Sequence, residues 1–136
     1  MDRSLQIIGL AKKAGLLAVG TADTGAAART GKVRLVISAN DASSNAVRKA
    51  CNAAQTCSVP HIIVPYTSFE LGNVSKRGSP GTIAFLDIGL ASSFMNSMSE
   101  AEPERFKEPT GLLAQQAREH AKKKKTTPPV KRRTMQ

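Results

Sequence analysis

A stripe of apolar residues at helical spacing runs over residues 5–14 and predicts a helix that Gly15 ends. The stripe consists of Leu5, Ile7, Ile8, Leu10 and Ala11. An apolar run at 16–19 then predicts a short strand, and residues 22–30 predict a second helix with unusually small side chains. Gly25 within that helix costs about 1 kcal/mol relative to Ala, so the close approach of another backbone is one explanation for its presence.

The middle of the chain alternates between strand-like and helix-like patterns. Residues 33–39 and 59–64 are mostly apolar and predict buried strands. Residues 44–55 lie between them and predict an amphipathic helix. Its apolar face consists of Val47, Ala50, Cys51 and Ala54. The turn before this helix, at 40–43, carries polar side chains, among which we assign Asp41 to capping.

Capping residues mark the next element. Thr67 and Glu70 have the spacing of a capping box, which introduces a short helix to about residue 74. A basic loop with Gly and Pro follows at 76–81, then a strand at 82–86 and a last helix at 88–98. This alternation predicts an α/β fold, a three-layer α/β/α sandwich with a central four-stranded mixed sheet. We expect residues 1–98 to form this one domain.

The composition changes after Met98. Residues 99–136 have few branched aliphatic side chains and many Glu, Lys, Pro and Thr residues. Such a segment cannot bury enough apolar surface to offset the entropy lost on ordering. We therefore expect 99–136 to be a charged, largely disordered tail, in which residues 109–125 form at most a transient helix. The boundary also divides the net charge of +10 equally, with +5 on each side.

This positive charge indicates polyanionic partners, either nucleic acid or acidic membrane surfaces. In the tail, the basic residues after residue 121 have no acidic residue among them. This run is consistent with RNA anchoring, with a solubility extension or with an unusual terminus, and we favour RNA anchoring. The expected phosphate contacts are Lys122, Lys123, Lys124, Lys125, Lys131, Arg132 and Arg133.

Several function classes lack support in the sequence. It contains no pattern typical of a secretory signal or a membrane span, and Cys51 and Cys57 are expected to be reduced, buried thiols, so we expect a cytoplasmic location. His61 and His120 have no partners at metal or triad spacing, and we find no phosphate-binding Gly-rich loop or nucleophile elbow. We expect no metal, no cofactor and no catalytic residue, and hence no enzymatic activity.

Five short segments of the chain carry a family resemblance. They are residues 6–15 (QIIGLAKKAG), 19–21 (VGT), 31–37 (GKVRLVI), 40–43 (NDAS) and 69–72 (FELG). In order and spacing they resemble the bacterial YlxQ branch of the kink-turn-binding ribosomal protein superfamily. The resemblance covers residues 5–94, about two thirds of the chain, and several segments in register are more specific than any one alone.

The resemblance implies the three-layer fold, the binding of structured RNA on or near the ribosome, and no catalysis. Members of this superfamily hold RNA on the start of the second helix and on the loop before the last strand. The corresponding helix residues are Gly20, Thr21, Ala22, Asp23 and Ala26. The corresponding loop residues are Lys76, Arg77, Ser79, Pro80, Gly81 and Thr82.

Elementary chemistry supports RNA binding at the start of the second helix. A helix start offers unpaired N–H groups and a positive dipole end to a phosphate. Asp23 can accept hydrogen bonds from a guanine edge, or it can act only as a first-turn acid that stabilises the helix. Ala22 and Ala26 stand where the superfamily has an amide and an ammonium group, so each is expected to forfeit about 1–3 kcal/mol of base discrimination.

General affinity for RNA depends less on those two positions. We expect it to persist through cations elsewhere in the domain, which are Lys12, Lys13, Lys32, Arg34, Lys76 and Arg77. The non-functional alternatives are a plain strand-to-helix turn at Gly20 and a solvated basic loop at 76–81.

The favoured hypothesis is a monomeric, cytoplasmic RNA-binding protein whose partners are ribosomal or other structured RNA and ribosomal or translation-associated proteins. A first alternative is an adaptor at the nucleoid or an anionic membrane surface that acts through the basic tail, without membrane insertion. A second alternative is the RNA-recognition subunit of an RNA-modifying complex. The second is disfavoured because 136 residues leave no room for a cofactor-binding domain.

Overall fold

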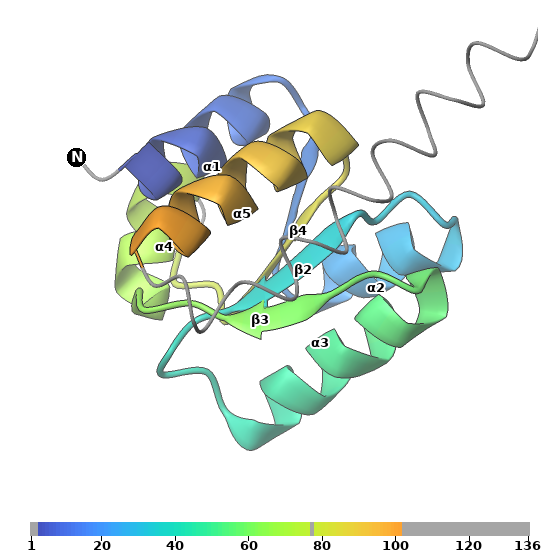
Figure 1. The fold of residues 1–136 in the computed structure, drawn as a ribbon. Helices are drawn as coiled ribbons and strands as arrows, with labels where there is room; N and C mark the ends of the chain where they lie inside the picture. Colours follow the sequence, from blue (N-terminus) through green and yellow to red (C-terminus); the bar gives the residue numbers. More distant parts are fainter. Residues whose placement is uncertain (1–2, 77, 102–136) are drawn as a thin grey trace, which may run out of the picture.

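The computed structural model describes residues 3–76 and 78–101, in which helices and strands alternate (Figure 1). The helices are α1 (Arg3–Lys13), α2 (Thr21–Arg29), α3 (Ser44–Cys57), α4 (Ser68–Ser75) and α5 (Ile88–Ala101). The strands are β1 (Leu17–Val19), β2 (Leu35–Ser38), β3 (His61–Ile63) and β4 (Thr82–Phe85). Every element predicted in this range is present, and the last helix continues beyond Met98 to Ala101. The tail contacts expected at 122–125 and 131–133, and the transient helix at 109–125, lie outside the described residues.

Strand β4 lies inside the sheet and runs opposite to both of its neighbours. The strand order is β1-β4-β2-β3, with β4 antiparallel to β1 and β2, and with β2 parallel to β3. Strands β1, β2 and β3 therefore share one direction and finish at Val19, Ser38 and Ile63 on the same side of the sheet. We call this side the carboxyl end of the sheet, and the opposite side its amino end.

Helices cover both faces of the sheet (Figure 1). Helices α1, α4 and α5 pack on the face that carries Leu35, Ile37 and Phe85. Helices α2 and α3 pack on the other face, which carries Val36 and Ala84. Successive residues of a strand point to opposite faces, so adjacent residues of β2 pack in different layers. The predicted three-layer α/β/α sandwich with a mixed sheet is confirmed.

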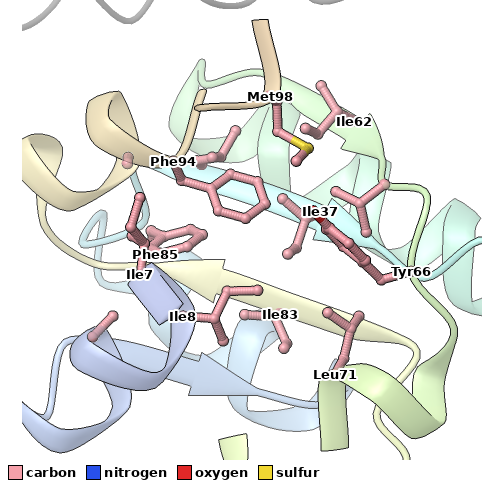
Figure 2. Close-up of a cluster of buried hydrophobic side chains, with 14 of the residues drawn as sticks. Ile7, Ile8, Ile37, Ile62, Tyr66, Leu71, Ile83, Phe85, Phe94 and Met98 are labelled. Carbon is pink, nitrogen blue, oxygen red and sulfur yellow. The ribbon is translucent and has the colours of Figure 1, made fainter. Parts of the chain in front are cut away.

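The two layers differ in the size of their buried side chains. Beneath α1 and α5 the core contains Phe85 and Phe94, which are fully buried with ring centroids 5.1 Å apart (Figure 2). Each such side chain contributes about 1.5–3 kcal/mol by leaving water. On the opposite face the buried side chains are mostly small, namely Ala18, Ala28, Val33, Val36, Ala50, Ala53, Ala54 and Ala84. The sandwich is thus stabilised mainly from the side of α1, α4 and α5.

Some local expectations were wrong. Leu10 is 59% exposed, because it lies about 100° around the helix from the fully buried Ala11. Cys51 and Cys57 are free thiols, but they are half-buried rather than buried. No backbone of another described element approaches Gly25, where an added Cβ would meet only the Arg29 Nη1 atom, at 3.8 Å.

None of the helices in the described part of the chain combines the length and the apolar character that a membrane crossing needs.

Candidate functional site

The start of α2 and the loop before β4 meet in one place, although they are far apart in the sequence. The Gly20 N–H donates to the Thr82 carbonyl oxygen at 2.8 Å, one step beyond the Val19 and Ile83 pair of the β1–β4 ladder. Gly20 has a φ of +96°, a backbone conformation that favours glycine. The structure therefore joins the two segments that the sequence analysis singled out separately.

The same loop also contacts the start of α3. The Ala39 N–H donates to the Gly81 carbonyl oxygen at 3.0 Å, which extends the β2–β4 ladder toward the loop. A Cβ added at Gly81 would stand 3.5 Å from the Cβ of Ala42. Residues 78–82 consequently reach the carboxyl end of the sheet between the starts of α2 and α3.

Helix α4 begins at the same end and is held there by side chains. The Ser68 N–H donates to Asp41 Oδ1 at 2.9 Å, which ties α4 to the loop after β2. Thr67 and Glu70 form the predicted capping box, with the Glu70 N–H donating to Thr67 Oγ1 at 3.1 Å. The capping role expected for Asp41 is therefore observed, on α4.

Three helix starts thus lie beside the ends of β1, β2 and β3, and at two of them the side chain of the N-cap residue accepts a helix N–H. Ser43 Oγ accepts from the Ala46 N–H at the start of α3, and Thr67 caps α4. Gly20 gives α2 no side-chain cap. The N–H groups of Thr21 and Ala22 have no carbonyl within the helix to bond, and they carry the positive end of its dipole. This geometry can bind a phosphate, at the side of an open α/β sheet where ligands generally bind.

The expected contact residues differ in how much they expose. Ala22, Asp23 and Ala26 are exposed, and Thr21 is half-buried. In the loop, the exposed residues are Lys76 and Ser79, and the half-buried ones are Pro80 and Gly81. Thr82 was expected to contact RNA, but its side chain is fully buried, because it begins the interior strand β4. Arg77 lies outside the described residues.

Four of the basic residues that were expected to contact RNA lie away from the start of α2. Arg34 precedes β2, and its N–H donates to the Phe85 carbonyl oxygen at 2.8 Å, at the amino end of the sheet. Lys32 comes shortly before Arg34, and Lys12 and Lys13 end α1, which leads into the start of β1. The structure therefore does not bring Lys12, Lys13, Lys32 and Arg34 together with the start of α2.

A polar cluster that the sequence analysis missed surrounds His61. His61 Nε2 lies 2.8 Å from Ser38 Oγ, and His61 Nδ1 lies 3.4 Å from Cys51 Sγ. The sequence analysis assigned His61 an ordinary surface or packing role, which these contacts fit, but it did not foresee the partners, because they depend on the β2–β3 register, which no local pattern reveals. Ser38 is fully buried, so its hydroxyl faces no solvent, and the cluster provides hydrogen-bond partners for polar atoms in the interior.

Burial acts on the charge of this histidine. It lowers the pKa of the His61 imidazole below its ordinary value of 6.5, since the charged ring would lose its hydration. The described residues contain no group of three or more His, Cys, Asp or Glu side chains that could hold a metal ion.

Comparisons with known proteins agree with this architecture. A protein of unknown function from Bacillus halodurans has a TM-score of 0.66 and 23% identity, covering 73% of this chain and 99% of its own. A Giardia lamblia 15.5kD RNA binding protein has a TM-score of 0.55 and 16% identity, covering 73% of this chain and 84% of its own. At these identities both likenesses show the fold. No curated protein matches the sequence.

The sequence itself carries a family match. Residues 2–89, well over half of the chain, match the family described as "Ribosomal protein L7Ae/L30e/S12e/Gadd45 family". This range includes β1 to β4 and the starts of α2, α3 and α4. The chain belongs to the ribosomal protein L7Ae/L30e/S12e/Gadd45 family.

Proposed function

We propose that this protein is a non-catalytic RNA-binding protein that holds a structured, kink-turn-like RNA at the carboxyl end of its sheet. The observation that carries the proposal is the 2.8 Å hydrogen bond from the Gly20 N–H to the Thr82 carbonyl oxygen. This bond joins the start of α2 and the loop before β4 into one surface. Family membership and the RNA-binding description of the Giardia protein support the proposal.

Backbone and side chains have different tasks in this proposal. The uncapped start of α2 binds a phosphate through the N–H groups of Thr21 and Ala22. Asp23 is exposed in the first turn of α2 and accepts hydrogen bonds from a guanine edge. Ala22 and Ala26 offer no polar atom to a base, so recognition relies on shape and phosphates more than on base edges.

The five segments that resemble the YlxQ branch support a finer proposal, in which the protein is a bacterial accessory of translation in the cytoplasm and ribosomal RNA is its partner. The basic residues after 121 add phosphate contacts that strengthen binding without adding sequence preference.

Titration of three nucleic acids tests this function: a kink-turn RNA, an RNA duplex of equal length and the corresponding DNA duplex. We expect the kink-turn RNA to bind most tightly. Asp23→Asn should weaken kink-turn binding by about 1–3 kcal/mol. The same change should leave duplex binding unchanged or stronger, because it removes a negative charge. Glu100→Gln, an exposed acid on α5, is the charge-matched control and should not weaken kink-turn binding. Equal affinity of the wild-type protein for all three probes would contradict the proposal.

A further inference from the structure

A groove of about 410 Å³ lies between α2 and α3, on the side of the sheet away from the large core. It begins at Thr21 and Ala22, in the first turn of α2, and extends past Gly25 to Arg29 in the last turn. The opposite wall comes from α3, with Lys49, Asn52 and Thr56 among its residues. The groove is therefore continuous with the helix start that we assign to phosphate binding.

The two helices run side by side in the same direction, which gives the groove its length. Near their far ends, Cys57 Sγ donates to the Ala28 carbonyl oxygen at 3.4 Å. At the carboxyl end of the sheet, the loop at Gly81 lies beside Ala42 and Ala46, at the start of α3. Small side chains keep the space open, and at Gly25 an added Cβ would meet only Arg29 Nη1. The glycine that is unfavourable in a helix thus forms part of the groove floor.

Charge and polarity in the groove suit a nucleic-acid backbone. Arg29 and Lys49 both line it, and none of the described residues that line it is acidic. Arg29 is exposed on α2 and Lys49 on α3, so cations border the groove from both helices. Asn52 presents an amide that can both donate and accept, and the Thr56 hydroxyl, which donates to the Asn52 carbonyl oxygen at 2.9 Å, keeps its lone pairs for an incoming donor.

We propose that this groove binds a single-stranded segment of RNA that continues from the phosphate at the start of α2, with Arg29 and Lys49 each contacting a phosphate. The inference rests on the proposed RNA-binding function and extends the interface to a surface that the sequence analysis did not identify. Asn52 and Thr56 contact the sugar, where a 2′-hydroxyl offers both a donor and an acceptor.

Size decides between a single strand and a duplex. A volume of about 410 Å³ is at the lower end of the range of small-molecule sites, about 300–1,000 Å³. It suits nucleotide units in extended conformation, whereas a double helix is too wide to enter between two packed helices. An acidic protein segment would also meet the two cations and the helix start, but membership of a family of ribosomal proteins favours RNA as the occupant.

The test uses the full-length protein and a kink-turn RNA in three forms: blunt, or with a single-stranded uridine extension of about ten nucleotides at the 5′ or the 3′ end of one stem. For the wild-type protein we expect one of the extended RNAs to bind about tenfold more tightly than the blunt RNA at low salt. In Arg29→Gln/Lys49→Gln this gain should disappear, while the blunt RNA is still bound. The salt dependence of extended-RNA binding should fall by about 1.4 in log–log slope, about 0.7 for each lost phosphate contact.

A control of equal charge separates groove contacts from net charge. Arg3→Gln/Arg48→Gln removes one exposed cation from α1 and one from α3, neither of which lines the groove. This control should keep the gain from the extension. Gly25→Leu fills the groove without changing charge and should abolish the gain, with circular dichroism confirming that the helices are intact.

The outcomes distinguish the two proposals. Tight binding of the blunt kink-turn RNA with no gain from either extension, or with a gain that persists in both groove variants, would overturn the groove proposal alone. Failure of the wild-type protein to prefer kink-turn RNA would contradict the proposed function. In that case a free uridine oligomer still tests the groove, and equal affinity for wild-type protein and Arg29→Gln/Lys49→Gln would overturn it.

Discussion

Gly72 of α4 lies so close to the backbone of Gly78 that a Cβ added at Gly72 would stand 1.7 Å from the Gly78 carbonyl oxygen. No side chain tolerates that separation, so α4 and the loop before β4 pack together only because position 72 has no Cβ. The loop leads on to Gly81 and Thr82, which meet the starts of α3 and α2. A glycine on one helix therefore positions the loop that completes the candidate interface.

Gly72→Ala should consequently displace this loop. Because the clash is with backbone, relief requires a main-chain shift, and we expect a loss of about 1–3 kcal/mol in the free energy of unfolding. Urea denaturation followed by circular dichroism measures this loss, and kink-turn RNA affinity should fall with it. Gly9→Ala is the matched control, since its Cβ would stand at an ordinary 3.8 Å from the Val74 carbonyl oxygen. A Gly72→Ala protein as stable as the wild type would contradict the packing described.

Phe94 should be among the most important side chains for stability. It is fully buried and packs on Phe85 between α5 and the sheet (Figure 2). Phe94→Ala removes the ring and leaves a cavity, so we expect a loss of about 3–5 kcal/mol in the free energy of unfolding. Phe69→Ala is the control, because Phe69 is 66% exposed and its truncation should change stability by less than about 0.5 kcal/mol. Equal losses in urea denaturation would show that the two phenylalanines are not distinguished by burial.

Local signals were enough to predict the elements of this fold. The capping box of Thr67 and Glu70 spans four consecutive residues, and its hydrogen bonds form as the pattern predicts. The short apolar runs of β2 and β4 are buried on both faces, which explains why they are recognisable without alternation. Each of these features depends on residues close together in the sequence.

Contacts between distant strands were not predictable in the same way. The meeting of Gly20 with Thr82 depends on β1 pairing with β4, and the Ser38–His61 contact depends on β2 pairing with β3. A one-residue shift in either register would move these groups apart or to opposite faces. The groove at Gly25 was missed for a related reason, since a glycine in a helix does not by itself reveal whether a backbone or an open space lies beside it.

His61 should make stability depend on pH. Burial lowers its pKa in the folded protein below the ordinary value of 6.5, so between the two values the unfolded chain binds more protons. The free energy of unfolding is therefore not reduced by His61 above about pH 7.5, where the ring is neutral in both states. It decreases as pH falls through 6.5 toward the folded pKa, because protonation then favours the unfolded chain. NMR titration of the ring should give a midpoint below 6.5. Urea denaturation of His61→Gln should show a weaker dependence in this window, and an unchanged dependence would assign the effect to other groups.

The basic tail should contribute affinity without selectivity. A full-length variant in which Lys122, Lys123, Lys124, Lys125, Lys131, Arg132 and Arg133 are all changed to Gln keeps chain length and removes only charge. We expect weaker binding to kink-turn RNA and to duplex RNA alike, with a shallower salt dependence for both. The ratio of the two affinities should stay constant. Loss of the kink-turn preference itself would show that the tail, rather than the carboxyl end of the sheet, carries recognition.

Gly25 should separate stability from binding. Its φ does not require glycine, and a Cβ would make only an ordinary contact, 3.8 Å from Arg29 Nη1. Gly25→Ala should therefore stabilise α2 by about 1 kcal/mol and raise the Tm by about 4–8 °C, as thermal denaturation can measure. The added methyl group also narrows the groove between α2 and α3, so affinity for the extended RNA should fall while affinity for the blunt RNA is kept. If the helix required glycine at position 25, Gly25→Ala would strain α2 and lower the Tm. Higher stability together with weaker binding of the extension would mean that this helix retains a less stable residue for the sake of the groove.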